Sequence, residues 1–233
     1  MWSTIKLVVV LVGLSVPAAL IALPWKMVTG DPRLIYEWGS WIAHFALRAA
    51  GVKMDVQGLE KIPAGRACLF MSNHLSNLDP PIIVPSLPGH VVVMVKKELM
   101  SIPLLGTAMK MVGYVAVERG QREKTMATLA AAEASLRAGR HMFVFPEGTR
   151  SRDGELLPFK KGSFELAMRA GVPVVPVAIW GTETMLRKGA WKIRPGVAHV
   201  RVLDAIYPEE FGTRDELVGR VRGAIEQAIG SRE

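Results

Sequence analysis

Several sequence patterns that carry common enzyme chemistries are missing from this chain. Its 233 residues include one cysteine, Cys68, which excludes an intramolecular disulfide. Cys68 lies in an apolar run, where packing in the core is the expected role of a thiol. The chain also contains no G-x-S-x-G nucleophile elbow, no H-E-x-x-H zinc site and no G-x-x-x-x-G-K-S/T phosphate loop. We therefore expect chemistry that uses neither a metal ion nor a cofactor.

Acidic side chains are scarce relative to basic ones. The chain has 21 Asp and Glu residues against 29 Lys and Arg residues, which gives a formal net charge of +8. This balance suits an anionic lipid surface, a phosphorylated lipid, an acidic carrier protein or the phosphates of coenzyme A. Nucleic acid is the rival partner, but the sequence has no nucleic-acid-binding module and no basic run interleaved with aromatic residues. We therefore predict that nucleic acid is not a partner.

Half of the residues are hydrophobic, and the excess is concentrated at the N-terminus. Residues 5–25 form an apolar run with one charged residue, Lys6, and as a helix they are long enough to cross about 30 Å of hydrocarbon. A spanning helix and a helix that dips into one leaflet both fit this run. A cleaved signal peptide also fits, because Lys6 precedes the run and small residues lie at 18–22.

A second helical pattern follows this run, after a helix-breaking linker at residues 29–32. The apolar stripe consists of Leu34, Trp38, Trp41, Ile42, Phe45 and Ala49, and the polar stripe of Glu37, Ser40, His44 and Arg48. Four of the six tryptophans, a residue that favours the membrane interface, precede residue 42: Trp2, Trp25, Trp38 and Trp41. We predict that residues 1–51 form an N-terminal membrane-anchoring helix pair, one inserted and one amphipathic, because cleavage would leave the second helix without its partner.

The remaining residues, 52–233, alternate between strand patterns and helix patterns. Strands are predicted at residues 53–57, 67–71, 90–95, 111–117, 141–145, 174–179 and 197–203. Helices are predicted at residues 81–87, 121–137, 161–169 and 214–229. This alternation predicts an α/β fold: a single catalytic domain with a mixed, partly parallel central sheet flanked by helices.

A histidine and an aspartate flank the end of the second predicted strand. Residues 73–79 read N-H-L-S-N-L-D, which places His74 and Asp79 five positions apart. In one continuous helix such residues lie about 140° apart around the axis and do not meet. A turn from strand to helix removes that obstacle, so that the Asp79 carboxylate reaches the His74 ring. The alternative is that Asp79 only caps the helix that Pro80 and Pro81 begin.

A second polar loop follows the strand predicted at residues 141–145. Residues 145–151 read F-P-E-G-T-R-S and offer backbone N–H groups, a hydroxyl and an arginine, which suit the binding of a phosphate. A third segment, residues 113–120, ends a strand in Arg119 and Gly120. An ordinary polar turn and a solvated strand end are the alternative interpretations of these two segments.

With these three segments in order, the chain resembles the glycerolipid acyltransferase family, and most closely the bacterial 1-acyl-sn-glycerol-3-phosphate acyltransferases. The resemblance extends from about residue 52 to about residue 203. It is carried by N-H-x-S-x-x-D at residues 73–79, the strand ending in Arg119 and Gly120, the loop at residues 145–151 and the apolar run at residues 172–178.

The resemblance implies a role for each of these residues. His74 is expected to be the general base that takes a proton from the acceptor hydroxyl, and Asp79 to accept the other ring N–H. Substrate binding is expected from Asn73, Ser76, Arg119, Glu147, Gly148, Thr149 and Arg150, with a further contribution from Lys160 and Lys161. Glu147 is expected to orient Arg119 or Arg150, or to bond a glycerol hydroxyl. Because the acceptor supplies the nucleophile, direct transfer without an acyl-enzyme is the simpler mechanism.

The resemblance also implies a reaction and a location. We expect transfer of a fatty acyl group from acyl-ACP or acyl-CoA to the sn-2 hydroxyl of 1-acyl-glycerol-3-phosphate (lysophosphatidic acid), giving phosphatidic acid for phospholipid biosynthesis. The enzyme is expected at the bacterial inner membrane, with the acyltransferase domain facing the cytoplasm. One alternative is another acceptor, such as a lyso-ornithine lipid or lysocardiolipin. The other is a non-catalytic, membrane-tethered lipid-binding protein, against which the intact His74, Asp79 and Arg150 argue.

Overall fold

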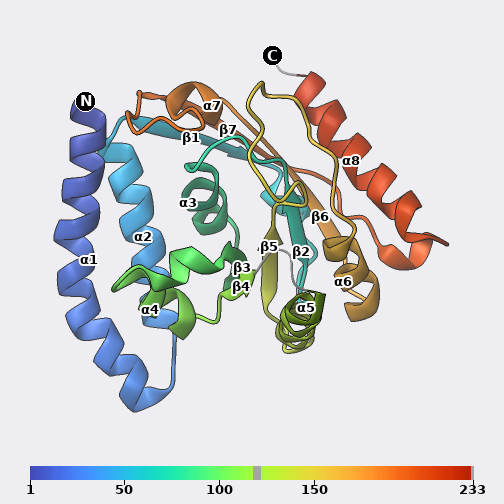
Figure 1. The fold of residues 1–233 in the computed structure, drawn as a ribbon, viewed down its shortest axis with the longest axis horizontal. Helices are drawn as coiled ribbons and strands as arrows, with labels where there is room; N and C mark the ends of the chain where they lie inside the picture. Colours follow the sequence, from blue (N-terminus) through green and yellow to red (C-terminus); the bar gives the residue numbers. More distant parts are fainter. Residues whose placement is uncertain (118–121, 232–233) are drawn as a thin grey trace.

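A computed structural model describes residues 1–117 and 122–231 of the chain (Figure 1). Its centre is one mixed sheet with the strand order β1-β7-β6-β2-β5-β3-β4. The strands are β1 (Val52–Gln57), β2 (Leu69–Ser72), β3 (Val91–Lys96), β4 (Val115–Val117), β5 (His141–Val144), β6 (Val174–Trp180) and β7 (Gly196–Val202). The pair β6 and β7 is antiparallel and the other neighbouring pairs are parallel, which confirms the predicted mixed sheet.

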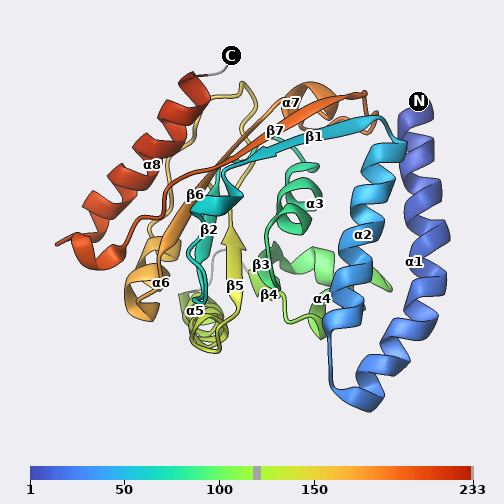
Figure 2. The ribbon, with the colours of Figure 1, turned by 180° about the vertical axis from the view of Figure 1, so that it is seen from behind.

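Helices and short 3-10 turns connect these strands. The α-helices are α1 (Trp2–Thr29), α2 (Arg33–Ala49), α3 (Asp79–Ile83), α4 (Leu105–Met111), α5 (Arg122–Arg137), α6 (Gly162–Ala170), α7 (Thr182–Met185) and α8 (Arg214–Gly230). The 3-10 turns are η1 (Leu59–Lys61), η2 (Val84–Ser86), η3 (Lys97–Ser101) and η4 (Pro208–Glu210). Figures 1 and 2 show α2 and α3 on one side of the sheet and α5, α6 and α8 on the other.

Because both faces of the sheet are covered, its central strands are mostly apolar, with polar residues only at their ends. Strand β2 shows how successive residues divide between the two faces. Phe70 packs into the hydrophobic cluster under α2 and α3, whereas Leu69 and Met71 pack into the cluster under α5, α6 and α8. The period of two that defines a strand is therefore present, but the sequence does not display it as alternation of polar and apolar residues.

Two predicted elements differ from the observed ones. The strand predicted at residues 111–117 is wrong at its start, because Met111 ends helix α4 and the strand begins at Val115. This short apolar segment fits either a strand or a buried helix, and its tertiary position decides between them. The helix predicted at residues 81–87 begins earlier, at Asp79, and passes at Val84 into a 3-10 turn.

The first two helices run side by side in opposite directions at one end of the molecule, with α1 on the outside (Figure 2). Helix α1 is long and apolar enough to cross a membrane, and Ala22 is its one buried residue. Ile42 of α2 is buried, but Trp41 and Phe45 of the predicted apolar stripe are exposed and stack on each other with ring centroids 5.3 Å apart. An apolar outer surface therefore extends over both helices.

Candidate active site

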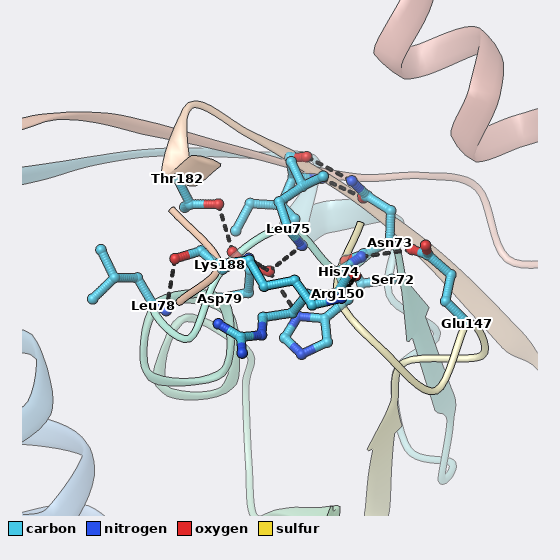
Figure 3. A network of polar contacts seen from close by, with 12 residues as sticks. Ser72, Asn73, His74, Leu75, Leu78, Asp79, Glu147, Arg150, Thr182 and Lys188 are labelled. Carbon is cyan, nitrogen blue, oxygen red and sulfur yellow. Dashed lines mark hydrogen bonds and ion pairs between the residues drawn. The ribbon is translucent and has the colours of Figure 1, made fainter. Parts of the chain in front are cut away.

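Two loops meet at the edge of the sheet where β2 and β5 end. These strands are parallel neighbours, so their carboxyl ends lie together. The chain leaves β2 at Ser72 and turns through residues 73–78 into α3, while the loop that follows β5 begins at Phe145. The carboxyl edge of parallel strands is where open α/β sheets bind their ligands. Figure 3 shows the predicted His74, Asp79 and Arg150 gathered at this place.

His74 and Asp79 form a hydrogen-bonded pair. Nδ1 of His74 lies 2.9 Å from Oδ2 of Asp79. Since a carboxylate only accepts hydrogen bonds, this contact places the ring proton on Nδ1 and leaves the lone pair of Nε2 available as a base. The Asp79 side chain is fully buried, whereas the His74 side chain is 16% exposed. The turn from strand to helix thus brings the two residues together, as their spacing predicts.

The carboxylate of Asp79 is held from three further directions. Its Oδ2 accepts the backbone N–H groups of Leu75 at 2.7 Å and Ser76 at 2.8 Å. Its Oδ1 accepts the hydroxyl of Thr182, the first residue of α7, at 2.5 Å. Asp79 is itself the first residue of α3, and its side chain does not cap that helix. The alternative interpretation of Asp79 as a helix cap is therefore wrong.

Glu147 supports the backbone of His74. Its Oε1 accepts the N–H of His74 at 2.7 Å and its Oε2 accepts the N–H of Leu157 at 3.1 Å. Burial raises the pKa of Glu147 to about 7; the two N–H groups oppose this shift, and the nearby Asp79 carboxylate adds to it. The predicted partner Arg119 lies outside the described residues. The other predicted partner, Arg150, does not occupy either carboxylate oxygen, so Glu147 acts on the loop that carries His74.

Two further contacts from the loop after β5 hold the histidine. The Phe145 ring stacks on the His74 ring with centroids 3.8 Å apart and an angle of 14° between the planes. The N–H of Ser151 donates to the carbonyl of His74 at 2.8 Å. The ring and the backbone of His74 are thus clamped by a segment that lies about seventy residues away in the sequence.

Asn73 and Ser76 are buried, and their side chains bond to backbone groups of other segments. The Asn73 amide donates to the carbonyl of Ile179 at 2.8 Å and accepts its N–H at 2.9 Å. The Ser76 hydroxyl donates to the carbonyl of Leu186 at 2.9 Å and accepts the N–H of Leu78 at 3.2 Å. This geometry does not support the prediction that they contact substrate; it shows them fastening the histidine loop to the rest of the domain.

Cationic groups lie along the second loop. Lys188, which the sequence patterns did not single out, donates from Nζ to the carbonyl of Arg150 at 2.6 Å and to the hydroxyl of Thr149 at 3.5 Å. Gly148 adopts a left-handed conformation with φ of 68°, and a Cβ at this position would lie 2.8 Å from Nζ of Lys160. The ammonium groups of Lys160 and Lys188 therefore flank the loop at residues 145–151. Because this loop is predicted to bind phosphate, we name it the phosphate loop.

The predicted pair of lysines divides between two places. Lys160 lies over the phosphate loop, but Lys161 forms an exposed ion pair with Asp215 at 2.8 Å.

Within residues 1–117 and 122–231, no group of three or more His, Cys, Asp and Glu side chains is placed to hold a metal ion. The site places the His74 imidazole beside a loop that Lys160 and Lys188 contact.

Comparison with known proteins agrees with this geometry. The model of the acyltransferase family matches residues 53–180, which include the His74 and Asp79 pair and the whole phosphate loop. The chain belongs to the acyltransferase family. The resemblance predicted from the sequence is thereby confirmed.

Proteins named 1-acyl-sn-glycerol-3-phosphate acyltransferase are similar to this acyltransferase. The one from Borreliella burgdorferi is 33% identical over 143 residues, which are 61% of this chain and 57% of the relative. The human alpha form is 33% identical over 179 residues, 75% of this chain and 63% of the relative. The chloroplastic form from Brassica napus is 36% identical over 167 residues, 71% of this chain and 47% of the relative. The chain thus spans about half to two thirds of the length of such relatives.

A solved structure extends the similarity to the whole chain. The crystal structure of the 1-acyl-sn-glycerophosphate (LPA) acyltransferase PlsC from Thermotoga maritima superposes with a TM-score of 0.86 at 26% sequence identity. The match covers 99% of this chain and 96% of that one. The similarity therefore includes the N-terminal helices as well as the sheet.

Proposed function

We propose that this acyltransferase moves a fatty acyl group from an acyl thioester to the sn-2 hydroxyl of 1-acyl-sn-glycerol-3-phosphate, giving phosphatidic acid. The observation that carries the proposal is the hydrogen bond between His74 and Asp79, which leaves Nε2 of His74 available beside the loop that contains Arg150 and that Lys188 contacts. This arrangement suits an acceptor that has both a hydroxyl and a phosphate. The names of the relatives support the same acceptor.

In the proposed mechanism, His74 acts first as a base and then as an acid. Nε2 takes the proton of the acceptor hydroxyl while that oxygen attacks the thioester carbonyl. The N–H at Nδ1 keeps its hydrogen bond to Asp79, which stabilises the imidazolium that forms. When the tetrahedral intermediate collapses, the C–S bond breaks and the imidazolium returns its proton to the departing thiolate. The products are an ester and a free thiol.

The environments of two candidate nucleophiles, Ser76 in the histidine loop and Cys68 at the other end of β2, support direct transfer. The Ser76 hydroxyl is buried and donates to the carbonyl of Leu186. The Cys68 thiol is buried before β2, and burial raises its pKa to about 11, which disfavours the reactive thiolate. Neither group is suited to carry an acyl chain, so the hydroxyl of the acceptor remains the nucleophile.

We assign phosphate recognition to Arg150, Lys188 and Lys160, together with Arg119 from the sequence motif. Charge-assisted hydrogen bonds to phosphate are roughly twice as strong as neutral ones, and a guanidinium binds two phosphate oxygens at once. We assign Asn73, Ser76 and Glu147 to the support of the His74 loop.

We further propose that residues 1–51 hold the acyltransferase domain, residues 52–233, on the bacterial inner membrane, with the domain facing the cytoplasm. The exposed apolar surface of α1 and the exposed Trp41 and Phe45 on α2 support membrane contact. An acceptor with one acyl chain resides in the bilayer, so an enzyme held at its surface meets the acceptor there.

An acyl-transfer assay with the purified full-length protein tests the reaction. The acceptors are 1-acyl-sn-glycerol-3-phosphate, a lyso-ornithine lipid, lysocardiolipin and glycerol-3-phosphate, each with acyl-ACP and with acyl-CoA. We expect thioester-dependent formation of phosphatidic acid from the first acceptor, and its loss in His74→Ala. Transfer only to another lysolipid would replace the acceptor, and lipid binding without transfer to any acceptor would overturn the enzymatic proposal.

A further inference from the structure

The loop between α7 and β7 carries a cluster of cations around an exposed tryptophan. Residues 186–197 include Arg187, Lys188, Lys192 and Arg194 and no acidic residue. Lys188 points to the candidate site, but Arg187, Lys192 and Arg194 are exposed. Trp191 between them is 64% exposed, and Nζ of Lys192 lies 5.4 Å from its ring centroid. Neither the core nor the proposed chemistry accounts for a tryptophan in this position.

This loop is fastened to the first turn of α1. The N–H of Ile193 donates to the hydroxyl of Thr4 at 2.9 Å, and that hydroxyl lies 3.4 Å from the carbonyl of Trp191. Ile193 is buried in the hydrophobic cluster against which Leu7 also packs. Figures 1 and 2 both show this orange loop against the N-terminal end of α1. The backbone of Trp191 is therefore held beside the first turn of α1, in which Trp2 is 74% exposed.

We propose that Trp191, Arg187, Lys192 and Arg194 form a second membrane contact, which binds anionic lipid headgroups at the bilayer surface. This inference rests on the proposed membrane anchoring of residues 1–51. Tryptophan rings favour the level of the headgroups, and clustered lysines and arginines favour an anionic leaflet. We name residues 187–194 the headgroup loop.

The position of the headgroup loop along α1 gives the domain an orientation. Helix α1 has 28 residues, which corresponds to about 42 Å of length. The loop bonds to α1 near its N-terminal end, at Thr4, so in this proposal the headgroup plane passes through that end. The loop also reaches the candidate site, because Lys188 bonds to the carbonyl of Arg150. The base and the phosphate loop would thus open near the plane in which a lysolipid keeps its phosphate.

An acidic acyl carrier protein is the rival partner for these cations. The observations favour the membrane because the exposed Trp191 belongs to a loop whose backbone is bonded to Thr4, in the first turn of the exposed apolar helix α1. A carrier protein would use the positive charge but would not require the loop and the first turn of α1 to share one level.

A fluorescent probe at single cysteines tests the contact. In a Cys68→Ala background, Trp191→Cys, Trp2→Cys and Glu209→Cys are each labelled with an environment-sensitive dye on the full-length protein. The labelled proteins are reconstituted into phosphatidylcholine vesicles with and without phosphatidylglycerol. We expect a blue-shifted emission at positions 2 and 191 in the anionic vesicles. No shift is expected at the exposed Glu209, which lies in η4.

A charge variant tests the role of the cations. Arg187→Gln, Lys192→Gln and Arg194→Gln together should abolish most of the shift at position 191, because each cation contributes about fivefold to partitioning onto an anionic surface. The shift at position 2 should persist. A matched triple variant at other exposed cations, Lys61→Gln, Arg169→Gln and Arg220→Gln, should change neither signal.

The outcomes separate this inference from the proposal on which it rests. A shift at position 2 without a shift at position 191 would overturn the headgroup loop and leave the membrane anchor standing. The absence of a shift at both positions would overturn the anchor together with the loop. A shift at position 191 that acyl carrier protein produces and vesicles do not would assign the loop to a protein partner and overturn the membrane contact.

Discussion

The hydroxyl of Thr182 donates to Oδ1 of Asp79 at 2.5 Å, across 103 positions of the chain. Both side chains are fully buried. Because Thr182 occupies Oδ1, the other oxygen of Asp79 is directed at Nδ1 of His74. Gly181 makes the contact possible: its φ is 88°, and a Cβ there would lie 2.3 Å from the carbonyl oxygen of Val197. A residue outside the recognised motifs thus orients the Asp79 carboxylate toward His74.

Removal of this hydroxyl should lower turnover without changing acceptor binding. Thr182→Val keeps the shape of the side chain but leaves Oδ1 of Asp79 without its donor, which costs about 1 to 3 kcal/mol for a buried group. We expect kcat to fall about tenfold or more at an unchanged KM for the acceptor, and Thr182→Ser to restore most of it. Steady-state kinetics on all three proteins measures this. A valine variant that loses activity only through a lower melting temperature would show a merely structural role.

Removal of the base should nearly abolish turnover. A positioned general base contributes roughly 10² to 10⁴ in rate, so we expect His74→Ala to lose activity by at least this factor. The turnover of Asp79→Asn should fall comparably, because an amide, unlike a carboxylate, does not require the His74 ring to carry its proton on Nδ1. Initial rates and circular dichroism on the same preparations provide the measurement. Normal folding with near wild-type rates in both variants would exclude His74 as the base.

Removal of the cations at the phosphate loop should weaken acceptor binding. Hydrogen bonds to charged groups are worth about 1.5 to 3 kcal/mol, so Arg150→Ala and Lys188→Ala should each raise the acceptor KM by roughly ten- to one-hundredfold. Arg119→Ala is predicted to do the same. Arg152→Ala, in the same loop and exposed, is the matched control. If the variants raised the KM for a neutral monoacylglycerol acceptor as much as the KM for the phosphorylated acceptor, these residues would not recognise phosphate.

Glu147 should make stability depend on pH. Its pKa in the folded protein is raised to about 7 from an ordinary 4.5, so the folded state holds this proton more tightly than the unfolded state does. Its contribution to stability is therefore greatest below about pH 4.5 and is lost as pH rises through about 7. The melting temperature of the wild type, relative to Glu147→Gln, should rise as the pH is lowered through this range. If the difference in melting temperature between the wild type and Glu147→Gln stayed constant with pH, the raised pKa of Glu147 would be contradicted.

Deletion of α1 should release the protein from membranes. We choose residues 1–30 because α2 contributes Leu47 to the main hydrophobic cluster, so its removal would also damage the fold. Membrane fractionation should move the shortened protein to the soluble fraction, and its activity on bilayer-embedded lysolipid should fall more than its activity on detergent-dispersed lysolipid. N-terminal sequencing of the full-length protein is the control. A soluble mature protein that begins near Ala22 or Leu23 would establish the signal-peptide interpretation instead.

Local patterns determined a large part of this protein. The contact between His74 and Asp79 follows from a strand that turns into a helix within six residues, and that turn is visible as an apolar run followed by Asp79, Pro80 and Pro81. The alternation of apolar strands with helices predicts the α/β sheet, and the apolar run at the N-terminus predicts α1. These features depend on neighbouring residues, so the sequence alone is sufficient to predict them.

The groups that hold the histidine in place were decided only by the tertiary structure. Phe145 stacks on His74, Glu147 accepts its N–H and Thr182 bonds to Asp79 because β2 lies between β5 and β6 in the sheet. The same packing turned Asn73 and Ser76 from predicted substrate contacts into supports of the loop. Contacts between distant segments depend on strand order and on which side chains meet across it, and neither the spacing nor the type of the residues along the chain encodes that order.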